Sequence, residues 1–333
     1  MITNDDTRFH TPDDVAHDWA ETYYFDILIP EAGLHGFVYF VMRAGVGAAV
    51  CDVQFVDRNS ASPHAARYVD VQHHLPLPER LESFSLPNGA SLEARSATEY
   101  RVDYVGVDDT EVHLDYTGLM VPYDIHDPEI DPLAPPLRED AIKNSGFGTA
   151  YANHFDLASR ATGHVIVRGQ RYEVDAPVTM DHSWGPRPER AMAPMTWINA
   201  NFEDGLLMHG IWKFTPGEPG TEHEFAHGYA VVDGTTHGGV GGSMRVERDG
   251  LLGRTFEMTI QDRDGTDHHI TGAPVTNQIW FAYGCCPAAV AMVEWRTGDG
   301  RVGYGTSMES FPLDRFTGGN LPAAIALTHE AAR

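Results

Sequence analysis

The sequence contains very little lysine and cysteine. Only two of its 333 residues are lysines, Lys143 and Lys213, and the formal net charge is -25. Such a surface repels the phosphates of nucleic acids and of anionic lipids, so we expect neither nucleic-acid nor membrane-surface partners. The three cysteines, Cys51, Cys285 and Cys286, are odd in number and irregularly spaced, which argues against a disulfide framework.

Long apolar runs and leader-like segments are also missing. The segment from Met1 to Asp14 is polar and acidic and lacks the basic and apolar regions of a signal peptide. The most apolar stretch, residues 36–56, is interrupted by Arg43 and Asp52, which makes it too broken to span a bilayer. We therefore expect a cytoplasmic protein without membrane insertion.

Several familiar catalytic motifs are absent, and one is present in an unsuitable context. The chain has no Gly-x-Ser-x-Gly nucleophile elbow and no glycine-rich loop between a strand and a helix. Residues 223–227, His-Glu-Phe-Ala-His, match a zinc motif that requires a helix. The flanking pattern predicts a strand, on which His223 and His227 would lie about 13 Å apart. We therefore predict no metal, and metal analysis would test the zinc alternative.

Glycine and proline are frequent, and short strand patterns separate them. Residues 37–41 form a continuous apolar run, while residues 100–105, 112–116 and 256–260 alternate between apolar and polar side chains. Asp-Gly dipeptides at 204–205, 249–250 and 264–265 indicate hairpin turns. This spacing, without alternating helices, predicts an all-β sandwich or barrel fold.

The length of the chain favours two domains. Residues 180–195 change in composition and are rich in proline and arginine, so we place the boundary there, between domains at 1–188 and 189–333. The proline-rich acidic stretch from Tyr123 to Arg138 is interpreted as a long surface excursion. Residues 321–332 are expected to form one short helix.

The segment from Asp181 to Arg187, Asp-His-Ser-Trp-Gly-Pro-Arg, carries the densest group of reactive side chains. On a strand, Asp181 faces one way while His182 and Trp184 face the other. His182 is suited to proton transfer near neutral pH, and Trp184 to stacking on a ligand or a developing cation. Asp181 is suited to the role of an acid in a dry pocket or to that of a turn cap. A purely structural corner explains the segment equally well.

This segment, with residues 159–165 and Gly169 before it, resembles the tandem lipocalin-like family that includes carotenoid 1,2-hydratase, kievitone hydratase and lipocalin-type Diels–Alderases. Residues 19–36 and 303–309 resemble the family's opening and closing strands. The resemblance implies two lipocalin-like antiparallel β-domains in tandem and cofactor-free action on hydrophobic, isoprenoid-like or polyketide-like molecules. It assigns His182 and Trp184 to the hydratase His-x-Trp pair. The hydratases' later Tyr-x-Asp pair is missing, because residues 207–212 read Leu-Met-His-Gly-Ile-Trp.

Three functional hypotheses follow for the same site. The first is a cofactor-independent hydratase, dehydratase or isomerase that transfers protons to an apolar, isoprenoid-like substrate in a β-barrel cavity. The second is a pericyclase that templates its substrate, and the third is a non-catalytic carrier of hydrophobic ligands. The expected catalytic residues are His182, Asp181 and Trp184. The expected substrate-binding residues are Trp197, Tyr24, Asp26, His154, His209 and Glu309. The sequence leaves the oligomeric state open.

Overall fold

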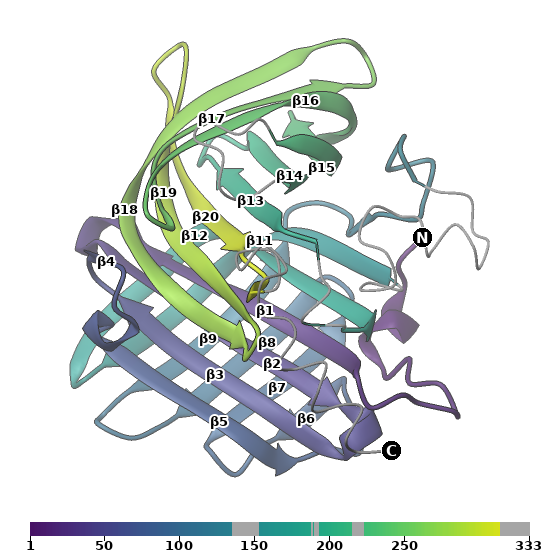
Figure 1. Cartoon of the computed structure of the whole chain (residues 1–333), viewed down its shortest axis with the longest axis vertical. Coiled ribbons are helices and arrows are strands. Elements are labelled where there is room, and N and C mark those ends of the chain that lie inside the picture. The colour runs from purple at the N-terminus through teal and green to yellow at the C-terminus, as the bar shows by residue number, and fades with distance from the viewer. Residues whose placement is uncertain (135–152, 188, 190–192, 215–222, 314–333) are drawn as a thin grey trace, which may run out of the picture.

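The computed structural model describes residues 1–134, 153–187, 189, 193–214 and 223–313. Over these residues the strands form two sheets (Figure 1), a curled half-barrel from the first half of the chain and a closed eight-stranded barrel from the second. The predicted all-β fold with two tandem barrel-like domains is therefore confirmed. The helix expected at residues 321–332 lies outside the described residues.

The first sheet has eleven strands. Along its main path their order is β5-β3-β2-β1-β12-β11-β9-β8-β7-β6, and β10 pairs with β11. The bounds are β1 (Trp19–Ile29), β2 (Leu34–Arg43), β3 (Ala48–Val56), β5 (Tyr68–Pro76), β6 (Ser83–Ser85), β7 (Ala90–Ser96), β8 (Glu99–Val105), β9 (Glu111–Gly118), β10 (Tyr123–Asp124), β11 (Asn153–Val167) and β12 (Gln170–Pro186). Short 3-10 helices are η1 (Asn4–Thr7), η2 (Pro30–Ala32), η3 (Ala44–Val46) and η4 (Pro63–Ala65).

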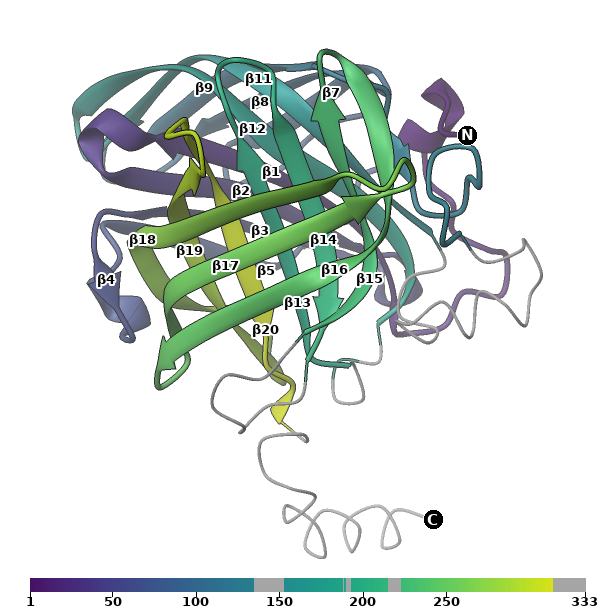
Figure 2. The same cartoon turned by 90° about the horizontal axis from the view of Figure 1, so that it is seen from above.

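The second sheet closes on itself because β17 pairs with both β16 and β18 (Figure 2). A short strand of the first half, β4 (Asn59–Ser60), joins its edge by parallel pairing with β18. The other bounds are β13 (Met195–Asn201), β14 (Leu207–Lys213), β15 (Glu224–Val232), β16 (Thr235–Asp249), β17 (Leu252–Asp262), β18 (Asp267–Tyr283), β19 (Cys286–Thr297) and β20 (Val302–Ser310).

Burial along the strands shows which parts of the first sheet face the second. In β8 buried positions alternate with more exposed ones, as expected of a strand with one wet face. In β1 every residue after Trp19 is buried. The reason is that β1 and β12 have the first core on one side and contact strands of the barrel, including β20, on the other. The continuous apolar run at 37–41 in β2 has the same explanation.

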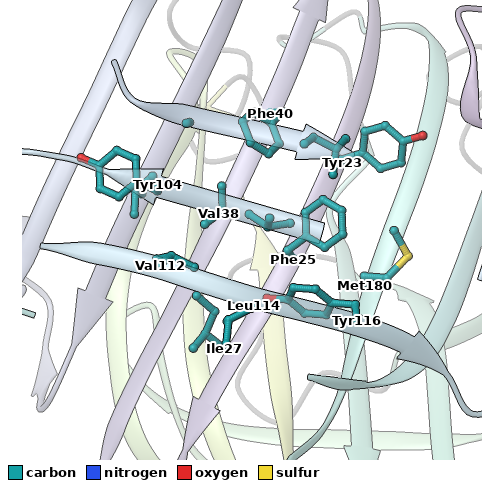
Figure 3. Close-up of a cluster of buried hydrophobic side chains, with 14 of the residues drawn as sticks. Tyr23, Phe25, Ile27, Val38, Phe40, Tyr104, Val112, Leu114, Tyr116 and Met180 are labelled. Atoms are coloured by element: carbon teal, nitrogen blue, oxygen red, sulfur yellow. The ribbon is translucent and has the colours of Figure 1, made fainter. Parts of the chain in front are cut away.

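Packed apolar side chains fill the interiors of both sheets. Figure 3 shows part of the first core, where Phe25 and Tyr116 from opposite parts of the sheet approach with ring centroids 5.0 Å apart. The barrel holds its own core, which includes Trp212, Phe256 and Trp295. Each core gains its stability mainly from the removal of this apolar surface from water.

The local sequence patterns were accurate for the described residues. The four strand segments fall in β2, β8, β9 and β17, and the three Asp-Gly dipeptides lie in the turns after β13, β16 and β17. The surface excursion was wrong for residues 123–127 and Asp131, which are buried, whereas Pro128 and Glu129 are exposed as predicted. Tyr123 and Asp131 are fully buried, because Tyr123 donates a hydrogen bond to the Gly228 carbonyl and Asp131 pairs with His227 of the barrel. Residues 135–138 lie outside the described residues.

The three cysteines are free thiols, with Cys51 and Cys286 buried. Within the part of the chain that the structure describes, no helix has the length and apolar character needed to cross a membrane.

Candidate functional site

A cavity lies between the two sheets, against β1 and β12 on one side and β13, β14, β18 and β20 on the other. It is narrow: the space open to the centre of a water-sized sphere is about 60 Å³, within about 730 Å³ of space between atoms that includes the open mouth. Much of its lining is aromatic or aliphatic, and includes Tyr24, Tyr39, Trp197, Ile211, Trp280 and Met308. The resemblance implies a ligand inside a barrel, whereas this cavity lies between the two sheets, because side chains fill the sheet interiors.

The register of three strands places polar side chains on the cavity wall. In β12, Asp181 pairs with Tyr24 of β1 on one side and with Asp156 of β11 on the other. Because alternate residues of a strand share a face, His154 joins Asp156 on the face toward the second sheet. Tyr24, His154 and Asp181 therefore line the same cavity, as does Trp197 from the barrel.

These groups form a connected polar cluster at one wall of the cavity. His154 Nε2 lies 2.9 Å from Asp156 Oδ2, and His154 Nδ1 lies 3.5 Å from Asp181 Oδ2. On the barrel side, His209 Nε2 lies 3.0 Å from the same Asp156 oxygen, and Trp197 Nε1 donates to Asp156 Oδ1 over 2.7 Å. Asp156 thus joins both sheets behind the cavity-lining residues His154 and Trp197.

Burial and neighbouring charges shift the pKa values of Asp181 and Asp156 in opposite directions. Burial raises the pKa of Asp181 to about 7, and the neighbouring Asp156 carboxylate adds to this effect against the opposing influence of His154. Burial opposes ionisation of Asp156 as well, but the imidazoles of His154 and His209 lower its pKa below the usual range. Burial also opposes the charged form of His154, yet Asp156 and Asp181 raise its pKa. The arrangement is an acid–imidazole pair with an ionised carboxylate behind it.

His182 and Trp184 lie on the other face of β12. His182 is fully buried in the first sheet, stacked on Tyr23 with ring centroids 4.0 Å apart, and its Nδ1 donates to the Thr22 carbonyl over 2.8 Å. Burial lowers the pKa of His182 to about 3, so its ring is neutral near pH 7. Trp184 packs into the first core. Neither side chain lines the cavity, and the split between Asp181 and His182 that strand geometry predicted is confirmed.

Asp26 and Glu309, two further predicted binding residues, do not themselves line the cavity. Asp26 accepts hydrogen bonds from Thr306 over 2.6 Å and lies 2.9 Å from His35 Nε2 between the sheets. Glu309 forms an ion pair with Arg248. His209 contacts the site through Asp156.

The His-Glu-x-x-His segment lies at and just before β15, as the strand prediction required. His227 pairs with Asp131, whereas the ring of His223 lies 3.3 Å from the Met244 carbonyl. The two histidines thus have separate partners.

Sequence reasoning missed Asp156, Tyr39, Trp280 and Tyr283. For Asp156 a local signal existed, because His154-x-Asp156 places an imidazole and a carboxylate on one face of a strand. Tyr39 and Tyr283 belong to different sheets, and their hydroxyl groups lie 2.8 Å apart at the cavity. Nothing in a local pattern indicates such a pair.

A broader groove adjoins the cavity. It shares Ala282 and Tyr283 with the cavity lining and is also bordered by Arg43, His74 and Cys285. Arg43 lies over the Tyr283 ring, 5.5 Å from its centroid. The groove therefore adjoins the cavity at Ala282 and Tyr283.

Comparisons with known proteins agree with this architecture. The model of a family described as "Domain of unknown function (DUF7064)" matches residues 3–310. No curated protein matches the sequence. A Nitrosomonas europaea protein provisionally named AttH shares 13% identity with a TM-score of 0.55, over 89% of this chain and 94% of its own. Kievitone hydratase from Nectria haematococca shares 11% identity with a TM-score of 0.50, over 91% and 90%. These likenesses confirm the fold that the family resemblance implied.

Proposed function

Because the chain belongs to the DUF7064 family, whose description names no activity, we propose its function from the cavity. The protein is an enzyme that transfers a proton to or from an apolar, isoprenoid-like small molecule bound between the two sheets. The supporting observation is the Asp181–His154 pair on the wall of a cavity whose other walls are largely aromatic and aliphatic.

In the hydratase direction, the acid–imidazole pair gives a proton to one carbon of an alkene. Water then adds to the cationic carbon, and its surplus proton returns to the pair, so that the product is an alcohol and the enzyme is regenerated. Dehydration is the reverse, and loss of a different proton from the cation gives an isomer. Protein groups supply and recover the proton in each case, so the proposal needs no cofactor.

The other cavity residues have matching roles. Trp197 and Trp280 present aromatic rings to the cavity, where a developing positive charge is stabilised by a π face. The carboxylate of Asp156 stabilises the charged form of His154, which contacts Asp181. Few competing waters fit among the apolar walls, which favours proton transfer to carbon. We place His182 and Trp184 outside this reaction because they face the first core.

Kievitone hydratase carries the hydration reaction in its name and has the same fold, which supports this class of chemistry. Because the Tyr-x-Asp pair of the hydratases is missing from this chain, the proton transfer is assigned to other residues. The proton-transferring group is assigned to Asp181 and His154 on the cavity face, and not to residues 207–212 of β14.

The test combines ligand recovery with isotope exchange. Small molecules extracted from the purified protein are identified by mass spectrometry, and the recovered compound, together with farnesol and squalene, is incubated with the enzyme in D₂O. Wild type is expected to place deuterium on a carbon of its substrate. Asp181→Asn and His154→Gln are expected to lose about 10²–10⁴-fold in rate, the usual contribution of a positioned acid or base.

Asp175→Asn is the matched control, since Asp175 lies on the same strand but is exposed. Recovery of a bound ligand that the protein leaves chemically unchanged, with no deuterium incorporated, would contradict the proposal and indicate a carrier. Turnover that survives Asp181→Asn and His154→Gln nearly intact would instead indicate a cyclase that works by templating.

A further inference from the structure

Three side chains of types that can ligate a metal ion converge on the face of the first sheet opposite the cavity. A ring nitrogen of His10, a carboxylate oxygen of Glu21 and a ring nitrogen of His182 all lie within 4.8 Å of one another. They come from the segment before β1, from β1 and from β12. Glu21 and His182 are fully buried, and His10 is partly buried. None of them belongs to the proposed proton-transfer site.

The orientation of His182 suits a metal ligand. Its Nδ1 lies 2.8 Å from the Thr22 carbonyl, so this nitrogen carries the hydrogen and Nε2 carries the lone pair. Nε2 is buried and has no hydrogen-bond partner among the described residues. A histidine that binds a metal commonly donates its other ring N–H to a backbone carbonyl in this way, which fixes the ring and raises its basicity.

Glu21 is held by neighbours of its own. Its carboxylate accepts hydrogen bonds from the backbone N–H of His10, over 2.9 and 3.0 Å, and from the hydroxyl of Thr11 over 2.7 Å. The indole of Trp19 donates to it over 3.2 Å. These contacts keep a charged group in place inside the protein, where an uncompensated carboxylate would be costly.

His10 completes the set with a fixed ring. Its imidazole stacks on Trp184 with centroids 3.6 Å apart and an angle of 1° between the planes, and its Nδ1 lies 3.3 Å from Glu21 Oε2. Asp6 Oδ1 lies 3.5 Å from the other ring nitrogen and adds negative charge beside the cluster. All three candidate ligands are therefore oriented before any ion binds.

We infer that His10, Glu21 and His182 form a binding site for a divalent transition-metal ion such as Zn²⁺. Two imidazoles and one carboxylate are a donor set that zinc takes readily, whereas calcium and magnesium prefer oxygen ligands alone. The ion ties the segment before β1 to β1 and β12, the strands whose opposite faces carry Tyr24 and Asp181. The site is separate from His223 and His227, and a metal ion here departs from the prediction of no metal that was made for the whole chain.

The inference is tested on untagged protein that has been stripped with a chelator. The protein is loaded with Zn²⁺ alone, passed through gel filtration and analysed for bound metal, and a parallel sample is loaded with Co²⁺ to record its visible ligand-field spectrum. Wild type is expected to retain one zinc ion per chain and to show the absorption of cobalt bound by nitrogen ligands. His10→Gln is expected to lose both signals.

His237→Gln is the matched control, since His237 lies near Asp262 and Asp264 in a second group of candidate ligands that is more exposed. It is expected to keep the zinc ion and the spectrum. The melting temperature without metal shows whether His10→Gln still folds, and zinc should raise it for wild type and His237→Gln but not for His10→Gln. Absence of bound zinc in wild type, or equal binding by His10→Gln, would overturn the inference. None of these measurements depends on catalysis.

Discussion

Asp181 and His182 are neighbours in the chain, yet their side chains lie on opposite faces of β12. Asp181 lines the cavity between the sheets and contacts His154, whereas His182 is fully buried in the first sheet beside Tyr23. One strand therefore carries the wall of the proposed reaction site on one face and the candidate metal ligands on the other. Substitutions can therefore be chosen that alter the side chains on one face of β12 and leave those on the other face unchanged.

Trp197→Phe tests how strongly the two domains are joined at Asp156. The indole Nε1 donates to the Asp156 carboxylate over 2.7 Å, and both side chains are buried. Phenylalanine keeps an aromatic ring but removes this donor to a charged group, so the free energy of unfolding should fall by about 1–3 kcal/mol. Denaturant unfolding measures the change.

The control is Trp295→Phe, which removes an indole donor to a neutral acceptor, the Asn199 carbonyl, over 2.9 Å. Its loss should be smaller, because hydrogen bonds to charged groups are stronger. Equal losses in the two variants would show that the charge of Asp156 does not strengthen its contact with Trp197.

Local patterns predicted the secondary structure well. The alternation of apolar and polar side chains in residues 100–105 predicts a strand with one solvent-exposed face, and the Asp-Gly pairs predict hairpin turns. Both predictions succeed because these properties depend on neighbouring residues alone. The burial of residues 123–127 and Asp131 was not predictable in this way. It depends on Gly228 and His227, which reach the segment only through the tertiary fold.

The candidate site was also only partly predictable, because part of it depends on contacts between residues far apart in the sequence. The period of a strand separates Asp181 from His182, but it does not show which face borders the cavity. That depends on how the second sheet packs against β1 and β12, and hence on residues such as Trp280 and Tyr283. The candidate metal ligands likewise combine His10 with His182, which no short motif contains.

The hydrogen bond between Tyr39 and Tyr283 joins the two sheets at the cavity. Their hydroxyl groups lie 2.8 Å apart. In a double-mutant cycle, Tyr39→Phe and Tyr283→Phe should each lower the free energy of unfolding, and the double variant should lose about 1 kcal/mol less than the sum of the two. Denaturant unfolding of the four proteins gives the coupling. Fully additive losses would show that the two hydroxyl groups do not stabilise each other.

Asp52→Asn tests a pH-dependent contribution to stability. Burial raises the pKa of Asp52 to about 7, although the indole of Trp280 and the amide of Gln54 favour its ionised form. The folded state therefore holds this proton more tightly than the unfolded state, whose carboxyl has the ordinary value of 3.8. The contribution to stability is fully present below the unfolded pKa and is lost as pH rises through the folded pKa, by up to about 4 kcal/mol.

The measurement compares the free energy of unfolding at about pH 5 and about pH 8, a range that spans the folded pKa. Asparagine cannot ionise, so Asp52→Asn should lose less stability than wild type across this range. Asp175→Asn, at an exposed position, should follow wild type. The assignment fails if Asp52→Asn and wild type show the same dependence on pH.

Ala282→Trp tests whether the groove is the route into the cavity. Ala282 borders both spaces and is only partly buried, so a larger side chain is expected to obstruct the passage at little cost to folding. Binding of anilinonaphthalene sulfonate, a fluorescent probe with apolar aromatic rings and one sulfonate group, should weaken by about tenfold or more, because the variant removes volume from a site that binds mainly by apolar contact. Phe281→Trp, which changes the exposed neighbouring position on β18, should bind the probe like wild type. If Ala282→Trp binds the probe as tightly as Phe281→Trp, ligands reach the cavity by a path other than the groove.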